Sequence, residues 1–229
     1  MESSTSESKS RPAKSIGVYG QQIPSIEGLS VDPLNFCVRD SGLIVPERMY
    51  NPSYTIFLSG DVDIEMLDYL KNELIELEEA DIFVKNLNID LASYGGEVYY
   101  GFAVYDALSI FRNEKNLSIT TTSIGPVMSM AALILQVGDV RRMSANSVML
   151  IHPITGLATG SKNEIKAESV QMDRLDKVYS EILVARAQAS GVESTTEKVL
   201  EEITNAHNGV GTYLSAQEAK KYGFVDEVI

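Results

Sequence analysis

The sequence predicts an α/β fold of stacked βαβ units, and two observations lead to this prediction. Between residues 54 and 229, short runs rich in β-branched and aromatic residues alternate with longer segments of helical periodicity. Several of the short runs end in glycine or proline, as strands do before a turn. Repeated alternation of this kind is typical of parallel strands joined by right-handed helical crossovers.

The first expected elements are a short strand over residues 55–60 and a helix over residues 61–83. The helix is indicated by apolar residues at helical spacing, with acids on the opposite face: Ile64, Leu67, Leu70, Leu74, Ile75 and Leu77. The elements expected after it are a buried strand over 86–93, a helix over 98–112, a strand over 117–125, a helix over 127–138, a strand region over 139–153, a long amphipathic helix over 161–189, a helix over 196–203, and a helix with a short strand over 214–229.

The N-terminal part of the chain has a different texture. Residues 1–20 are polar and predict a disordered tail. Residues 21–53 predict an irregular arm, because four prolines interrupt regular structure there: Pro24, Pro33, Pro46 and Pro52. We therefore expect a flexible tail and arm over residues 1–53 and one domain over residues 54–229.

Composition excludes several classes of function. A net charge of −13 would repel nucleic acid and anionic membranes, so neither is an expected partner. A single cysteine, Cys37, cannot form a disulfide within the chain and favours a reducing compartment. The polar N-terminus lacks an apolar signal core, and the apolar run 130–137 is too short to span a bilayer. We expect a cytoplasmic protein.

Ser129 is the first candidate for chemistry, because it follows a predicted strand and falls just inside a predicted helix. Free N–H groups at a helix start favour negative charge, and the amide of Met130 could face an oxyanion. Local sequence alone favours a simpler role, capping of the helix.

Two further segments supply possible partners for this serine. The glycines of Tyr94-Gly95-Gly96 let a backbone approach a ligand, which makes the Gly96 amide a candidate oxyanion donor, although a plain turn has the same pattern. His152 ends an apolar strand and could act as a base or be structural. His207 lies in a polar segment that is typical of a solvated loop.

Other chemistries lack their motifs. The sequence has no cysteine–histidine cluster for zinc, no phosphate-binding G-x-x-x-x-G-K-[ST] and no dinucleotide glycine fingerprint after a strand. We therefore expect neither a metal nor a cofactor.

Five segments, in order and similarly spaced, resemble the ClpP family, the proteolytic subunits of Clp proteases. The resemblance runs from residue 54 to residue 229. The segments are TIFLSGDVD, IDLASYGGEVYYGFAVYDAL, GPVMSMAALILQVG, RRMSANSVMLIHPITGLATG and LSAQEAKKYGFVDEVI.

The resemblance implies a ClpP/crotonase-like spiral of stacked ββα-type repeats with a protruding handle helix near residues 161–189. It implies a nucleophile at Ser129, a general base at His152, and oxyanion donors at Gly96 and Met130. Such a serine endopeptidase would hydrolyse protein or peptide substrates inside a homo-oligomer of two stacked seven-membered rings, or in mixed rings with another ClpP. An AAA+ unfoldase would feed these rings, and the subunit itself would need no cofactor.

The chain departs from the family at the third triad member, an Asp shortly before the closing segment. An ungapped comparison puts Gly211 at this position, and no Asp occurs between Asp176 and Asp226. Four residues of a lengthened interval could orient the histidine instead: Glu202, Asn205, His207 and Asn208. Tyr94 also replaces the proline of the family's S-P-G-G run.

Three hypotheses of different classes follow. The first is the serine endopeptidase, with retained hydrolysis. The second is a catalytically weakened or inactive ring subunit with a structural role, which the missing Asp favours. The third is an enoyl-CoA hydratase-like enzyme, which would share the spiral fold and the oxyanion glycine, bind acyl-CoA and need no Ser–His pair.

Overall fold

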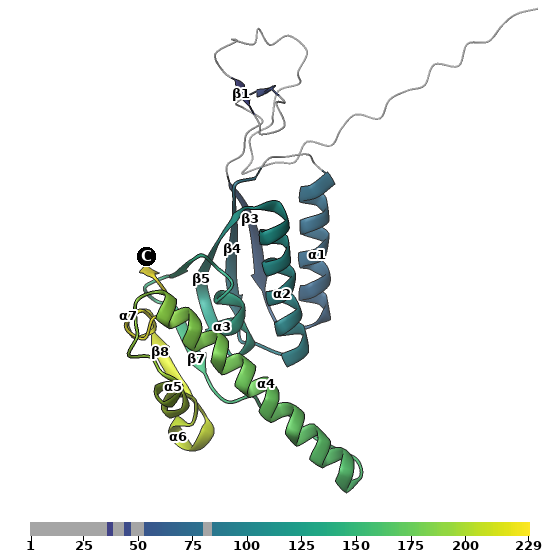
Figure 1. Cartoon of the computed structure of the whole chain (residues 1–229), viewed down its shortest axis with the longest axis vertical. Helices are drawn as coiled ribbons and strands as arrows, with labels where there is room; N and C mark the ends of the chain where they lie inside the picture. Colours follow the sequence, from purple (N-terminus) through teal and green to yellow (C-terminus); the bar gives the residue numbers. More distant parts are fainter. Residues whose placement is uncertain (1–35, 39–43, 47–52, 80–83) are drawn as a thin grey trace, which may run out of the picture. The chain divides into compact units, whose positions relative to one another are not determined.

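The computed structural model (Figure 1) describes residues 36–38, 44–46, 53–79 and 84–229. The chain divides into two compact units, Met1–Glu47 and Arg48–Ile229. In the first unit, β1 (Phe36–Val38) and β2 (Ile44–Pro46) pair antiparallel. The prediction of irregular structure is wrong for these two strands. The expected disordered tail lies outside the described residues, and its flexibility stays a prediction.

A seven-stranded sheet organises the second unit. All its pairings are parallel except that of β7 with β8. Its strands are, in chain order, β3 (Ser53–Ser59), β4 (Asn86–Ser93), β5 (Ser118–Met128), β6 (Val140–Met143), β7 (Val148–Ile151), β8 (Thr212–Ser215) and β9 (Glu227–Val228). This mixture of a parallel sheet with helices is the α/β fold that the sequence predicted.

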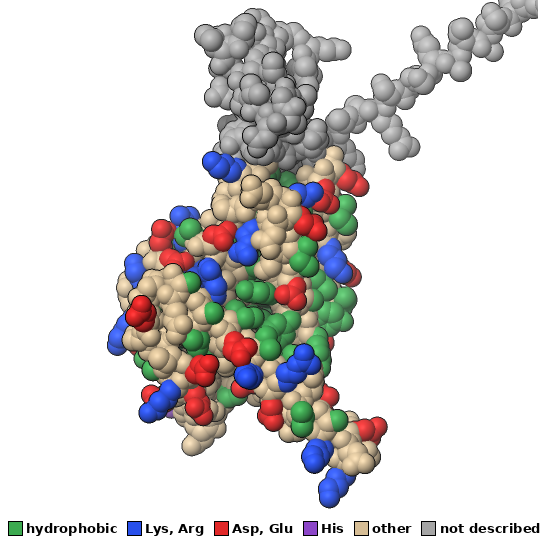
Figure 2. Space-filling model, viewed as in Figure 1, with side chains coloured by type: hydrophobic (Ala, Val, Ile, Leu, Met, Phe, Trp, Pro, Cys, Tyr) green, Lys and Arg blue, Asp and Glu red, His purple; other side chains and the backbone are tan. Residues whose placement is uncertain are grey.

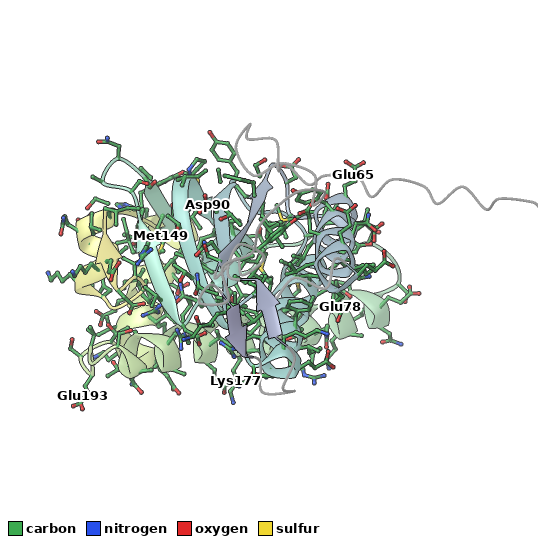
Figure 3. The ribbon with its side chains drawn as sticks, turned by 90° about the horizontal axis from the view of Figure 1, so that it is seen from above. Glu65, Glu78, Asp90, Met149, Lys177 and Glu193 are labelled. Carbon is green, nitrogen blue, oxygen red and sulfur yellow. The ribbon has the colours of Figure 1, made fainter. Side chains whose placement is uncertain are left out.

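The strand β5 positions the site, because it pairs with two different strands along its length. Its first half pairs with β6, whereas Val127 and Met128 pair with Met149 and Leu150 of β7. Near its end β5 therefore lies between β4 and β7. Figure 3 labels one residue of each of these two neighbours, Asp90 of β4 and Met149 of β7. Parallel strands end at the same edge of a sheet, so residues that follow β4, β5 and β7 come together there.

Two helices cover one face of this sheet. α1 (Ile64–Glu79) and α2 (Val98–Lys115) pack side by side (Figure 1), and α1 begins where Asp63 Oδ1 accepts the Met66 N–H at 3.0 Å. Alternate residues of β4 are buried in the same hydrophobic core as these two helices, and of them Leu87, Ile89 and Leu91 are fully buried.

The outer surface of α1 and α2 keeps a number of large hydrophobic side chains. Figure 2 shows hydrophobic side chains gathered over these helices on the face in view. The exposed ones are Ile64, Tyr69 and Ile75 on α1, and Tyr99 and Ile110 on α2. Apolar surface of this kind is typical of contact with another protein chain.

The long helix α4 (Lys162–Ala189) extends beyond the sheet (Figure 1). It starts at a capping box, in which Ser161 and Glu164 satisfy each other's backbone N–H groups. All its buried residues lie in its C-terminal half: Tyr179, Leu183, Val184 and Ala187. The N-terminal half therefore projects, as the expected handle helix would.

The remaining helices are α3 (Met130–Leu135), α5 (Glu197–Thr204), α6 (Ala206–Gly209) and α7 (Ala216–Lys221). α3 begins three residues later than the helix that the sequence predicted, because Val127 and Met128 belong to β5. No helix in the described part of the chain is both long and apolar enough to cross a membrane.

Candidate active site

Ser129 lies at the junction between β5 and α3. Its backbone has φ 54° and ψ −125°, a combination that non-glycine residues rarely adopt. Such a conformation costs about 1–3 kcal/mol and persists only where neighbouring bonds hold it. Here the Ser129 N–H donates to the Leu150 carbonyl at 2.9 Å, and the Ser129 carbonyl accepts the Ala132 N–H at 2.9 Å.

The role that local sequence favoured for this serine, helix capping, is wrong. Ser129 occupies the N-cap position of α3, but its side chain makes no capping hydrogen bond there. A serine on a strained strand-to-helix turn instead presents its hydroxyl outward, as in nucleophile elbows.

The glycine turn after β4 lies directly against Ser129. A Cβ at Gly95 would lie 2.6 Å from Ser129 Cβ and 3.2 Å from Ser129 Oγ, so a larger residue would push the serine away. The Ser93 hydroxyl accepts the Gly95 N–H at 3.1 Å and so stabilises the turn. Tyr94, which stands where the family has proline, is 72% exposed and leaves the turn intact.

Two backbone amides near Ser129 are available to a ligand. Val62 bonds to the turn on both sides of Gly96: its N–H donates to the Gly95 carbonyl at 2.9 Å, and its carbonyl accepts the Glu97 N–H at 2.7 Å. The Gly96 N–H itself has no acceptor among the described residues. The same holds for Met130, the first residue of α3, whose N–H has no intrahelical partner.

His152 follows β7, the strand that pairs with the end of β5. Since Met128 pairs with Leu150 in parallel register, Ser129 and His152 both emerge at the same edge from neighbouring strands. The structure therefore brings the two predicted residues to one place. Among the described residues, neither the Ser129 hydroxyl nor the His152 ring has a hydrogen-bond partner.

Gly211, which only an ungapped comparison puts at the expected place of the third triad member, lies against His152. A Cβ at Gly211 would lie 2.5 Å from His152 Cβ and 2.3 Å from the Ile151 carbonyl oxygen. With φ at 92°, this backbone also disfavours any residue but glycine. A carboxylate could not be placed there without moving the chain.

The four residues considered as replacements for the Asp are not brought to the histidine by any hydrogen bond. All of them are exposed: Glu202, Asn205, His207 and Asn208. His207 and Asn208 have left-handed backbone conformations, with φ 54° and 62°, inside the short α6. The interpretation of His207 as a solvated loop residue fits this placement.

A pocket of about 470 Å³ opens beside the glycine turn. The turn before α1, the residues around Gly96, and Thr155 and Met172 line it. Three of the lining residues carry carboxylates, namely Asp61, Asp63 and Glu97. These carboxylates give the pocket an anionic lining.

Two residues near the site were missed by sequence reasoning, Asp176 and Tyr179 of α4. Asp176 bonds to the segment that follows His152, and Tyr179 bonds to the Ser129 carbonyl. Their spacing of three is a helical one, but every face of an amphipathic helix has such pairs, so the sequence offers no distinguishing signal.

The geometry points first to a class, the α/β serine hydrolases, in which a strained serine turn works with a histidine on a neighbouring segment. The comparisons with known proteins then identify the family. The family model described as "Clp protease" matches residues 44–229. The ATP-dependent Clp protease proteolytic subunit of Chlorella vulgaris is 31% identical over 185 residues, which cover 79% of this chain and 85% of that protein. The chain belongs to the Clp protease family, as its five segments indicated.

Proposed function

We propose that the protein is a serine endopeptidase subunit of a Clp-type protease, and that Ser129 is its nucleophile. The observation that carries the proposal is the strained backbone of Ser129 between the Gly95–Gly96 turn and the strand that leads to His152. Strain of this kind is retained at functional sites and has no use in helix capping.

The reaction follows from the positions of these groups. Ser129 Oγ attacks the carbonyl carbon of a peptide bond while a ring nitrogen of His152 takes the hydroxyl proton. The carbon–nitrogen bond then breaks, and His152 returns the proton to the leaving amine. Water hydrolyses the resulting ester of Ser129 by the same proton path, which frees the acid product and restores the serine.

The oxyanion that forms in each step needs hydrogen-bond donors. The amides of Gly96 and Met130 are suited to this role because Gly96 follows the glycine that contacts Ser129, Met130 follows Ser129 itself, and neither amide has another acceptor in the described structure. One such donor contributes about 10²–10³-fold to kcat in serine proteases.

A second candidate function has an observation in its favour, namely the packing of Gly211 against His152. Without a carboxylate behind the histidine, serine protease triads lose roughly 10⁴-fold in kcat. A subunit weakened to that degree would serve mainly as a structural member of a ring that also contains a complete ClpP.

The partners of the protein follow from the family and from its surface. We infer that copies of the chain assemble through the exposed hydrophobic side chains of α1 and α2 and through the projecting half of α4. The expected assembly is two stacked seven-membered rings, built from this chain alone or from this chain and another ClpP. We expect an AAA+ unfoldase to deliver unfolded protein to these rings. Its expected location is the cytoplasm.

Peptide hydrolysis by purified protein tests the proposal. Wild-type chain, alone and mixed with a complete ClpP, is compared with Ser129→Ala and with His152→Ala. The matched control is His207→Ala, which removes the other of the two histidines from an exposed position. If the protein is an endopeptidase, Ser129→Ala and His152→Ala should lose turnover but still assemble, and His207→Ala should keep wild-type turnover. Absence of turnover by the isolated chain, together with incorporation into mixed rings, would favour the structural subunit.

A further inference from the structure

The helix α4 presents one line of side chains to the candidate site. Met172 lines the pocket beside Gly96, Asp176 bonds to the chain after His152, and Tyr179 bonds to Ser129. Steps of four and three residues place all three on the same face of a helix. Each of them contacts a different part of the site.

Asp176 makes the sole hydrogen bond of residues 152–154 within the described structure. Its Oδ1 accepts the Ile154 N–H at 2.8 Å. Because Pro153 has no N–H, Ile154 carries the first backbone donor after His152. A carboxylate acceptor makes this a charge-assisted bond, about twice as strong as a neutral one. The bond fixes the direction in which the chain leaves the histidine.

Tyr179 ties the same helix to the nucleophile. Its side chain is 1% exposed, and its hydroxyl donates to the Ser129 carbonyl at a distance of 3.5 Å. Burial, and then the charge of Asp176, raise the pKa of Tyr179 well above its ordinary value, so its hydroxyl keeps its proton to a higher pH than that of a free tyrosine.

The position behind His152 contributes no such tie. Gly211 has no side chain, and its backbone leaves no room for one. We propose that Asp176, together with Tyr179, positions the His152 segment against Ser129 and so replaces part of what a carboxylate at position 211 would do. Asp176 acts through the backbone at Ile154 and not through the ring of His152, so it is a positioning residue. The inference rests on the proposed peptidase function.

Three variants of α4, measured in the assembled full-length protein, test the inference. Asp176→Ala removes the acceptor, whereas Asp176→Asn keeps an oxygen at the same place and loses the charge. Asp173→Ala is the matched control, because Asp173 is an exposed acid one turn away on α4 without a hydrogen bond or ion pair to another described residue. The readouts are kcat and KM for a fluorogenic peptide and the rate at which a fluorophosphonate labels Ser129.

We expect Asp176→Ala to lower kcat and the labelling rate about tenfold with KM changed less than about twofold, since the loss concerns orientation and not substrate binding. Asp176→Asn should recover kcat to within about threefold of wild type, because its amide oxygen still accepts a neutral hydrogen bond. Asp173→Ala should match wild type. If Asp176 had a purely structural role, Asp176→Ala would change assembly or stability but would not lower kcat at nearly constant KM.

Three results would overturn the inference. They are an Asp176→Ala enzyme with wild-type kcat, a rise in KM at constant kcat, and a loss in kcat that Asp176→Asn does not recover. If Asp176→Ala does not assemble, Tyr179→Phe takes its place in the test. We expect kcat to fall about threefold in this variant, because the hydrogen bond from the Tyr179 hydroxyl to the Ser129 carbonyl is lost. An unchanged kcat would contradict the inference. Hydrolysis that survives Ser129→Ala contradicts the proposed function itself, which separates the two failures.

Discussion

A single methyl group at Gly95 should disable the site without unfolding the protein. The methyl of Gly95→Ala would lie 2.6 Å from Ser129 Cβ and 2.7 Å from the Met128 carbonyl oxygen. Carbon atoms pack at roughly 3.5–4.0 Å, so the glycine turn and the serine turn must separate by about 1 Å. A displacement of that size costs about a hundredfold in kcat, which corresponds to about 2.7 kcal/mol.

The matched control for this variant is Gly191→Ala, after the end of α4. The two glycines have similar backbones, with φ 96° at Gly95 and 85° at Gly191, so alanine costs each about 1–2 kcal/mol of conformational strain. A Cβ at Gly191, however, would meet nothing within 4 Å. Gly191→Ala should therefore lose stability alone.

Peptide turnover and urea unfolding of both variants, at one protein concentration, check this prediction. We expect kcat to fall about a hundredfold in Gly95→Ala and to stay at the wild-type value in Gly191→Ala. The free energy of unfolding should fall in both variants, because both carry the conformational strain of alanine at a positive φ. A Gly95→Ala protein whose kcat is within fivefold of wild type would refute the idea that contact between the two turns positions Ser129. Equal losses of kcat in both variants would refute it as well.

Further predictions concern stability, pH and specificity. Asp226→Asn should lower the free energy of unfolding by about 3 kcal/mol, because it deprives the fully buried Arg141 guanidinium of its carboxylate. Glu227→Gln, in the adjacent exposed ion pair with Arg142, should cost less than about 1 kcal/mol. Equal losses in urea unfolding would contradict this. Burial alone would raise the pKa of Asp226, but hydrogen bonds from Arg141 outweigh it and hold the pKa below its ordinary value of 3.8. The stabilisation is therefore present above this pH, and the difference between wild type and Asp226→Asn should shrink as the pH falls below it. At the pocket beside Gly96, we expect Glu97→Gln to lower the ratio of kcat/KM for a peptide with lysine to that for the same peptide with leucine before the cleaved bond. The expected fall is about fivefold, from the loss of about 1 kcal/mol of Coulomb attraction to the lysine. An unchanged ratio would contradict an electrostatic role for the pocket.

Much of the second unit could be predicted because its hydrophobic pattern follows the backbone period. The strand expected over residues 86–93 matches β4, in which every second side chain is buried. The strand β8 was missed because it has four residues and gains its hydrogen bonds from β7, far away in the sequence. Pairing of that kind is decided by tertiary contact and leaves no local period.

The candidate site could be predicted only in part. The resemblance of the surrounding segments to the ClpP family named Ser129 and His152, and the structure brings them to one edge of the sheet, whereas their catalytic roles stay predictions. The positive φ of Ser129 could not be read from Val127 and Met128, whose apolar side chains suit a strand and a helix equally. Asp176 could not be singled out, because α4 carries many acids and the one that meets Ile154 is selected by packing.

Mapping of a fluorophosphonate adduct tests the central claim most directly, namely that Ser129 is the nucleophile. The wild-type protein, Ser129→Ala and His152→Ala are treated with the probe, digested and analysed by mass spectrometry. The account predicts one modified serine, Ser129, in wild type, no adduct in Ser129→Ala, and labelling slowed by at least about a hundredfold in His152→Ala, because the serine then lacks its base. An adduct on another residue, or labelling of Ser129 at an undiminished rate without His152, would contradict it.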